Sequence, residues 1–235
     1  HPVASYLTYR APAELDGSLV RTSLQAISPD KTIISESTVG GDADYRFPSW
    51  SPDGVNIAYI SNNSNSSRYS LFTYDPERGL TVSLTEGLPT ADLENDPLAQ
   101  APKHLDWHPQ GNLIAFDQFT SIREPKGIQL HRDILVYDIQ QENIIPLEYS
   151  EWDEHSPVFS PLGAEVAFIS DRSGLYEIWT KNIISGQLRM LTAEGLAFPI
   201  DATGGGLDWD PSGTQLLYTG LQEGGQKVIY TLVLP

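Results

Sequence analysis

Residues 48–61, Pro-Ser-Trp-Ser-Pro-Asp-Gly-Val-Asn-Ile-Ala-Tyr-Ile-Ser, decide the fold, because the central part of this segment occurs three more times. An aromatic residue is followed two positions later by proline and four positions later by glycine. The copies are Trp50-Ser51-Pro52-Asp53-Gly54, Trp107-His108-Pro109-Gln110-Gly111, Phe159-Ser160-Pro161-Leu162-Gly163 and Trp209-Asp210-Pro211-Ser212-Gly213. These anchor aromatics are 57, 52 and 50 residues apart. A near-constant spacing of this size indicates a structural repeat.

Each copy predicts a tight turn between two strands. Proline presets the φ angle of the first central position, and glycine accepts the left-handed conformation that closes the turn. A short apolar run follows every copy, at 57–60, 113–116, 166–169 and 216–218. Continuous apolar runs of this length are typical of strands that are buried on both faces. We therefore expect a hairpin whose second strand lies in the core.

The rest of each repeat predicts two further strands. A polar loop such as 170–174 leads to an alternating segment such as 176–180, and a second turn leads to a fourth segment such as 188–192. Alternation with period two indicates one buried and one solvated face. Four antiparallel strands in about 50 residues form one blade of a β-propeller.

The two ends of the chain predict incomplete blades. Segments 6–9, 19–24 and 32–35 align with strands two, three and four of the later repeats, so the first blade lacks its inner strand. Segment 227–234 supplies a third strand, so the last blade lacks its outer one. We therefore predict an all-β fold, a single β-propeller domain over 1–235 with about five blades. Their approximate bounds are 1–39, 40–90, 91–149, 150–195 and 196–235.

The repeat resembles that of the periplasmic protein TolB and its relatives. The resemblance is carried by Pro48 to Ser61 and by 168–179, Phe-Ile-Ser-Asp-Arg-Ser-Gly-Leu-Tyr-Glu-Ile-Trp, and the pattern extends over nearly the whole chain. It implies the propeller fold and an extracytoplasmic location. TolB proteins have six blades and an additional α/β domain, and this sequence predicts neither.

Composition narrows the possible partners. The 31 acidic and 14 basic residues give a formal net charge of −17, which repels phosphate backbones and anionic membrane surfaces. We expect no nucleic-acid partner, and no apolar run reaches the length that inserts into a bilayer. The chain has no cysteine and begins at His1. Either a signal peptide has been removed, which we expect, or the chain has been trimmed.

The connections between blades predict the binding residues. In a propeller these connections approach the central channel at one face. The residues four positions before three of the anchors are basic, namely Arg46, Lys103 and His155, and the fourth position holds Gly205. We expect a basic ring at the channel mouth that attracts an anionic group. The alternative is that each basic residue pairs with a nearby acid.

Other residues of these connections complete the predicted site. Trp152 lies outside the anchor register and is predicted to be an exposed contact residue. Its neighbours Asp153 and Glu154, together with Asp44, are acidic candidates. We predict no cofactor and no metal, although acidic connections of this kind also suit Ca²⁺.

Three functions are compatible with these residues. The leading prediction is a non-catalytic scaffold that binds a protein or peptide, as a subunit of an exported or envelope complex. The second is a five-bladed glycoside hydrolase that uses carboxylates at the channel. Its candidate acids are Asp44, Asp106, Asp153, Glu154 and Asp208. The third is the propeller fragment of a serine peptidase.

Overall fold

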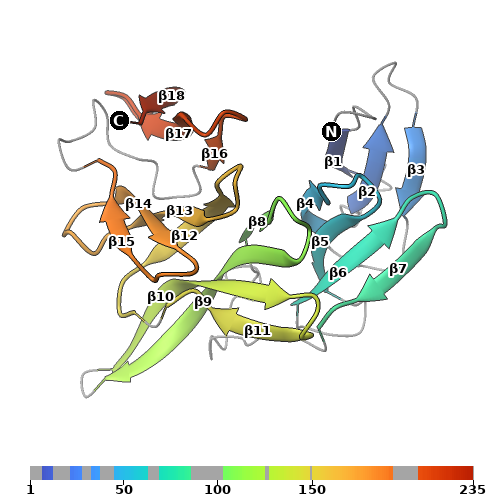
Figure 1. The fold of residues 1–235 in the computed structure, drawn as a ribbon, viewed down its shortest axis with the longest axis horizontal. Helices are drawn as coiled ribbons and strands as arrows, with labels where there is room; N and C mark the ends of the chain where they lie inside the picture. Colours follow the sequence, from blue (N-terminus) through green and yellow to red (C-terminus); the bar gives the residue numbers. More distant parts are fainter. Residues whose placement is uncertain are drawn as a thin grey trace. The chain divides into compact units, whose positions relative to one another are not determined.

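The computed structural model consists of antiparallel β-sheets, and it contains no helix among the residues that it describes (Figure 1). These residues are 7–12, 22–27, 33–37, 45–62, 69–85, 103–124, 127–148, 150–192 and 206–234. Within these ranges there is accordingly no helix with the length and apolar character needed to cross a membrane. The chain divides into two compact units, His1–Leu105 and Asp106–Pro235, and each is treated by itself.

The first unit contains a three-stranded and a four-stranded sheet, each in sequential order. The strands of the first sheet are β1 (Leu7–Pro12), β2 (Thr22–Ile27) and β3 (Ile33–Ser37). Those of the second are β4 (Tyr45–Trp50), β5 (Ile57–Asn62), β6 (Tyr69–Asp75) and β7 (Leu80–Ser83).

The second unit contains two further four-stranded sheets and a final three-stranded one. The third sheet consists of β8 (Lys103–Trp107), within which the boundary between the units falls, β9 (Leu113–Glu124), β10 (Gly127–Asp138) and β11 (Asn143–Pro146). The fourth consists of β12 (Glu154–Phe159), β13 (Glu165–Ser170), β14 (Glu177–Asn182) and β15 (Leu188–Met190). The fifth consists of β16 (Leu207–Trp209), β17 (Gln215–Leu221) and β18 (Lys227–Val233).

This series of sheets confirms the predicted fold class. Five antiparallel sheets follow one another, and the first and last have three strands among the described residues. The strands of the first blade lie slightly later than predicted, since Leu7 pairs with Ile27 rather than with a residue near position 24. Whether the five sheets form one domain stays a prediction.

The four repeated turns have the predicted conformation. In each, the glycine N–H donates to the carbonyl oxygen of the residue after the anchor aromatic, over 2.7 to 2.9 Å. Gly54, Gly111, Gly163 and Gly213 have φ angles between 71° and 75°. These are the left-handed values that favour glycine.

The sheets of the second unit are held together by apolar contacts between successive blades. Phe159 and Val166 of the fourth sheet are buried against Ala115 and Val136 of the third. Ile178 of the fourth sheet is buried in a cluster with Leu216, Tyr218 and Trp209 of the fifth. The third and fourth sheets are therefore each covered on one face by the next sheet along the chain.

One of the predicted buried strands departs from the pattern. Runs 57–60 and 166–169 are buried throughout, as predicted. In β17, Leu216 and Tyr218 are buried but Leu217 is 39 % exposed. The prediction that all four runs are buried on both faces is therefore wrong for the fifth sheet, because among the described residues no later sheet covers Leu217.

Candidate binding face around Trp152

Trp152 lies in a short connection that joins β11 to β12 in the second unit. Its side chain is 40 % exposed, whereas the residues that follow it, Glu154 to Ser160, are all buried. The Ser150 hydroxyl accepts a hydrogen bond from the Trp152 N–H and donates one to the Glu154 carboxylate. Trp152 is therefore an exposed aromatic residue in a connection whose backbone is held by hydrogen bonds to Ser150.

An ion pair fixes one side of this connection. The carboxylate of Asp153 accepts hydrogen bonds from the Arg132 N–H at 2.9 Å, from Arg132 Nε at 2.8 Å and from the Tyr176 hydroxyl at 2.7 Å. Burial by itself raises the pKa of Asp153, but the hydrogen bonds and charge of Arg132 outweigh it and lower the pKa to about 2. Burial and the hydrogen bond to Asp153 raise the pKa of Tyr176 to about 12. At neutral pH this is a fixed triad of cation, anion and phenol.

A second ion-pair network fixes the other side. Arg172 contacts the carboxylates of Glu154 and Glu148, and Lys181 Nζ lies 2.8 Å from Glu148. The Arg172 guanidinium also lies over the rings of Phe168 and Trp179, 5.5 and 5.2 Å from their centroids. Burial raises the pKa of Glu154 to about 7, against the lowering influence of Arg172. Both arginines near Trp152 are therefore neutralised internally.

The loop between β13 and β14 lies against the same connection. The Asp153 N–H donates to the Asp171 carboxylate over 2.9 Å, and the Asp171 N–H contacts the Asp153 carbonyl oxygen over 3.4 Å. This loop carries Leu175, a second large apolar side chain that is exposed. The connection at 150–153 and the loop at 171–176 therefore form one rigid surface with two apolar side chains.

A β-bulge follows Trp152 in β12. The pairing with β13 shifts between His155 and Val158, and Ser156 has a φ of 56°. His155 is fully buried, with Nδ1 2.9 Å from the Ser156 hydroxyl and its ring edge-on to Tyr176. The Ser156 N–H donates to the buried carboxylate of Asp117. Asp117 and His155 bring a carboxylate oxygen and an imidazole nitrogen within 4.8 Å of each other, and both are ligand types that divalent metals accept.

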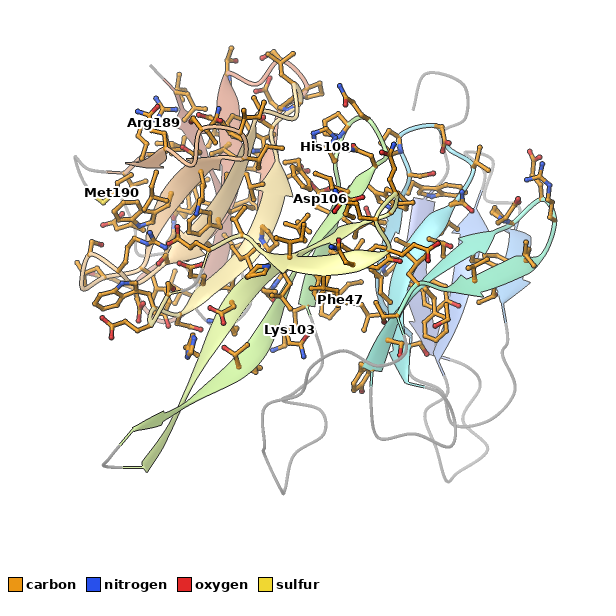
Figure 2. The ribbon with its side chains drawn as sticks, turned by 60° about the horizontal axis from the view of Figure 1, so that its bottom comes forward. Phe47, Lys103, Asp106, His108, Arg189 and Met190 are labelled. Carbon is orange, nitrogen blue, oxygen red and sulfur yellow. The ribbon has the colours of Figure 1, made fainter. Side chains whose placement is uncertain are left out.

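A carboxyl group joins the inner strands of the third and fourth sheets. Asp106 of β8 (Figure 2) accepts a hydrogen bond of 2.7 Å from the N–H of Phe159 in β12. Burial, helped by the negative charge of Asp208, raises the pKa of Asp106 to about 7. Partial desolvation also raises the pKa of Asp208, although the residue as a whole is exposed. Asp106 therefore contributes a structural hydrogen bond between neighbouring blades.

The structure describes some of the predicted site residues and leaves others outside the described ranges. Asp44 and the side chain of Arg46 lie outside the described residues. Lys103 begins β8 and is half-buried (Figure 2), and His155 is buried. Trp152 is exposed as predicted, and Asp153 and Glu154 lie beside it. The basic ring as a whole stays a prediction.

Three residues of this candidate site were not found from the sequence. Arg132, Arg172 and Tyr176 hold the acids beside Trp152 in place, yet Arg132 is 21 residues from its partner Asp153 and Tyr176 is 23 residues from it. No local pattern announces such pairs. The one available signal was the repeat itself, which in the fourth sheet brings the loop after the second strand against the connection before the first.

The sheets and their packing define a β-propeller fold. No protein-family model matches the sequence, and no curated protein matches it significantly. The solved structures that resemble it include TolB-like β-propellers. TolB from Acinetobacter baumannii is 18 % identical with a TM-score of 0.68, over 97 % of this chain and 50 % of that one. A candidate TolB from Agrobacterium tumefaciens is 17 % identical with a TM-score of 0.61, over 97 % and 82 %.

A propeller enzyme is similar to the same degree. Oligogalacturonate lyase from Vibrio parahaemolyticus is 13 % identical with a TM-score of 0.65, over 98 % of this chain and 59 % of that one. This chain therefore spans about half the length of the Acinetobacter TolB and has a TolB-like β-propeller fold. Identities this low establish the fold alone.

Proposed function

We propose that the chain is a non-catalytic propeller scaffold, located outside the cytoplasm, that binds a protein or peptide through the surface around Trp152. The observation that supports the proposal is an exposed tryptophan on a connection whose neighbouring acids are fixed by buried arginines. Tryptophan dominates many protein interfaces because it buries a large area while losing little side-chain entropy. A rigid surface also lowers the entropic cost of binding.

The engagement of the nearby acids supports binding over hydrolysis. Asp153 and Glu154 are each in contact with an arginine, and Asp106 accepts a backbone hydrogen bond. A pair of catalytic carboxylates needs one group that is free to attack or to activate water. These three of the five candidate acids each have a contact within the chain, although Glu154 Oε2 has no hydrogen bond.

The basic positions Arg46 and Lys103 lie in the first unit and form a separate part of the proposal. Arg46 and Lys103 each precede an anchor aromatic by four residues and begin or lie in an inner strand. They would attract an anionic group of the partner, such as a C-terminal carboxylate, to the channel mouth. His155, which is buried, would contribute by supporting the connection that carries Trp152.

The test compares capture of a partner by four forms of the tagged full chain. We expect Trp152→Ala to weaken binding of the protein enriched from an envelope extract by at least about tenfold, as for a central interface tryptophan. Leu162→Ala is the matched control, because Leu162 is 91 % exposed in the turn after β12. The double variant Arg46→Gln/Lys103→Gln tests the basic positions.

The two sets of variants test different parts of the proposal. Undiminished binding by Trp152→Ala with unchanged thermal stability would contradict the proposed surface. Undiminished binding by the double variant would remove the basic positions from the proposal and leave Trp152 in it.

A further inference from the structure

One core position of the third sheet holds a carboxylate where the sheets before and after it hold isoleucine. Asp117 is the tenth residue after its anchor aromatic, and the same offset gives Ile60 in the second sheet and Ile169 in the fourth. Both isoleucines are 0 % exposed, and Asp117 is 1 % exposed. Burying a charged group is costly unless the group is paired or binds a metal. A carboxylate at this position therefore calls for an explanation other than packing.

Two histidines lie beside this carboxylate. His104, Asp117 and His155 each offer an imidazole nitrogen or a carboxylate oxygen, and these three atoms all lie within 4.8 Å of one another. His155 is buried at the beginning of the bulge in β12. His104 is half-buried in β8, which is hydrogen-bonded to β9 in the third sheet although the boundary between the compact units falls one residue after it. The cluster therefore belongs to β8, β9 and β12.

Ser156 holds two of the three groups in place. Its N–H donates to Oδ2 of Asp117 over 2.9 Å, and its hydroxyl lies 2.9 Å from Nδ1 of His155. Histidines that bind metals regularly engage their second ring nitrogen in a contact of this kind, and carboxylate ligands are hydrogen-bonded in the same way. Ser156 has a φ of 56°, which costs energy in a residue other than glycine. The strained residue of the bulge is thus the one that orients both groups.

A cation near the cluster is engaged by another acid. Burial by itself lowers the pKa of Arg132, but the hydrogen bonds and charge of Asp153, together with the charge of Asp117, raise it. The Arg132 guanidinium donates hydrogen bonds to both carboxylate oxygens of Asp153. Arg132 is therefore committed to Asp153.

The donor atoms of the cluster select the kind of cation. Imidazole suits Zn²⁺ and similar transition metals, whereas Ca²⁺ is held by oxygen ligands. Zn²⁺ binds nitrogen and carboxylate oxygen at about 2.0 to 2.2 Å, so its ligand atoms lie at most about 4.3 Å apart. The 4.8 Å that bounds the cluster exceeds this by about half an ångström, which small side-chain rotations close. The net charge of −17 also favours uptake of a cation.

We propose that His104, Asp117 and His155 bind one Zn²⁺ ion or a similar divalent transition metal. Ser156 is a positioning residue that orients Asp117 and His155. The ligands are 13 and 38 residues apart in the sequence, a spacing that follows no local metal motif, so no metal was predicted there. The site goes beyond the proposed function, because Trp152 is not among its ligands.

Calorimetric titration of the untagged, chelator-treated full chain with Zn²⁺ tests the proposal. We expect one Zn²⁺ per chain and binding of Ca²⁺ that is weaker by at least about a hundredfold. Asp117→Asn and His155→Ala should each weaken Zn²⁺ binding by at least about a hundredfold, since loss of a group that merely supports a ligand costs about 10- to 100-fold. Ser156→Ala should weaken it by about tenfold. The matched control is His131→Gln, a buried histidine of β10 outside the cluster, which should bind as the wild type does.

A second measurement needs no substitution in the buried part of the cluster. The chain has five histidines, and one equivalent of Zn²⁺ should shift the imidazole NMR signals of two of them. His104→Gln, at the half-buried position, should remove one of these two signals. This measurement decides the matter if Asp117→Asn or His155→Ala fails to fold, which thermal unfolding of each variant reports.

Four results would overturn the proposal. They are a chain that binds no stoichiometric Zn²⁺, a tighter site for Ca²⁺ than for Zn²⁺, undiminished Zn²⁺ binding by folded Asp117→Asn and His155→Ala, and imidazole signals that do not move on addition of Zn²⁺. Loss of binding in His131→Gln as large as in His155→Ala would assign the metal to other residues and overturn it as well.

Discussion

Single residues at the repeated turns also make contacts between neighbouring sheets. The carbonyl oxygen of Gly163 lies 3.1 Å from Nε2 of His108, and the His108 ring stands edge-on to Phe159. A Cβ atom added to Gly163 would lie 2.3 Å from the same Nε2. The turn of the fourth sheet is therefore in contact with the turn of the third, on which Figure 2 labels His108.

Replacement of this glycine is expected to have two costs, one from backbone conformation and one from the clash. Gly163→Ala should lower the free energy of unfolding by about 3 kcal/mol, since the φ of 75° is unfavourable and His108 must move. Gly186→Ala is the control, because its φ is 72° but no atom lies within 4 Å of the added Cβ. We expect a loss of about 1 kcal/mol there.

Urea denaturation of both variants measures the difference. Equal losses for Gly163→Ala and Gly186→Ala would mean that the contact with His108 contributes nothing.

The conformation of the turns was predicted correctly because it depends on neighbouring residues. The contacts of the candidate site were not predicted because they join residues far apart in the sequence. Proline and glycine at fixed offsets favour a turn through their own conformational preferences, so the conformation of Gly163 was predictable. The contact with His108, 55 residues away, depends on how two blades pack. The same is true of Arg132 and Asp153, whose pairing no spacing in the sequence announces.

At the scale of the element, the strands of the third sheet are longer than the hydrophobic periodicity of the sequence predicts. The core strand around 113–116 was predicted, but β9 continues to Glu124 and pairs with β10, which begins at Gly127, as a hairpin of 12-residue strands. Residues 117–133 are largely polar, and polar segments were assigned to a loop. Hydrogen bonding between two chain segments, which the hydrophobic pattern does not report, maintains this extension.

The inner strands β8 and β12 are coupled by Asp106, and this coupling depends on pH. The pKa of Asp106 is raised from 3.8 to about 7, so the folded state holds this proton more tightly than the unfolded state does. Its contribution to stability is therefore complete below about pH 4 and is lost as the pH rises towards 7. Asp106→Asn keeps an acceptor for the Phe159 N–H but removes the ionisation.

We expect the variant to gain stability over the wild type as the pH rises from 4 to 7, measured by chemical denaturation at each pH. Asp210→Asn serves as the control, because hydrogen bonding lowers the pKa of Asp210, which therefore titrates below this range. A constant difference between Asp106→Asn and the wild type from pH 4 to 7 would contradict the raised pKa.

At the scale of the whole molecule, the five sheets raise the question of cooperativity. Repeat proteins are stabilised by contacts between neighbours, and the third, fourth and fifth sheets share apolar clusters. We predict that residues 1–235 form a single domain and unfold in one calorimetric transition, with equal calorimetric and van't Hoff enthalpies. Two transitions would instead identify 1–105 and 106–235 as independently folding domains.

The bulge in the inner strand has an evolutionary consequence. Phe47, His104 and Ser156 have φ angles of 50°, 48° and 56°, and each lies three residues before its anchor aromatic. In β4 and β12 the register of strand pairing shifts at the bulge. The residues before the bulge therefore do not follow the in–out alternation of side chains that the anchor aromatic starts. Residues upstream of the bulge are limited by their own contacts, as at the buried Glu154 and His155, and not by the alternation of the strand. Such an arrangement lets selection diversify the ligand specificity of a propeller while its architecture is inherited unchanged.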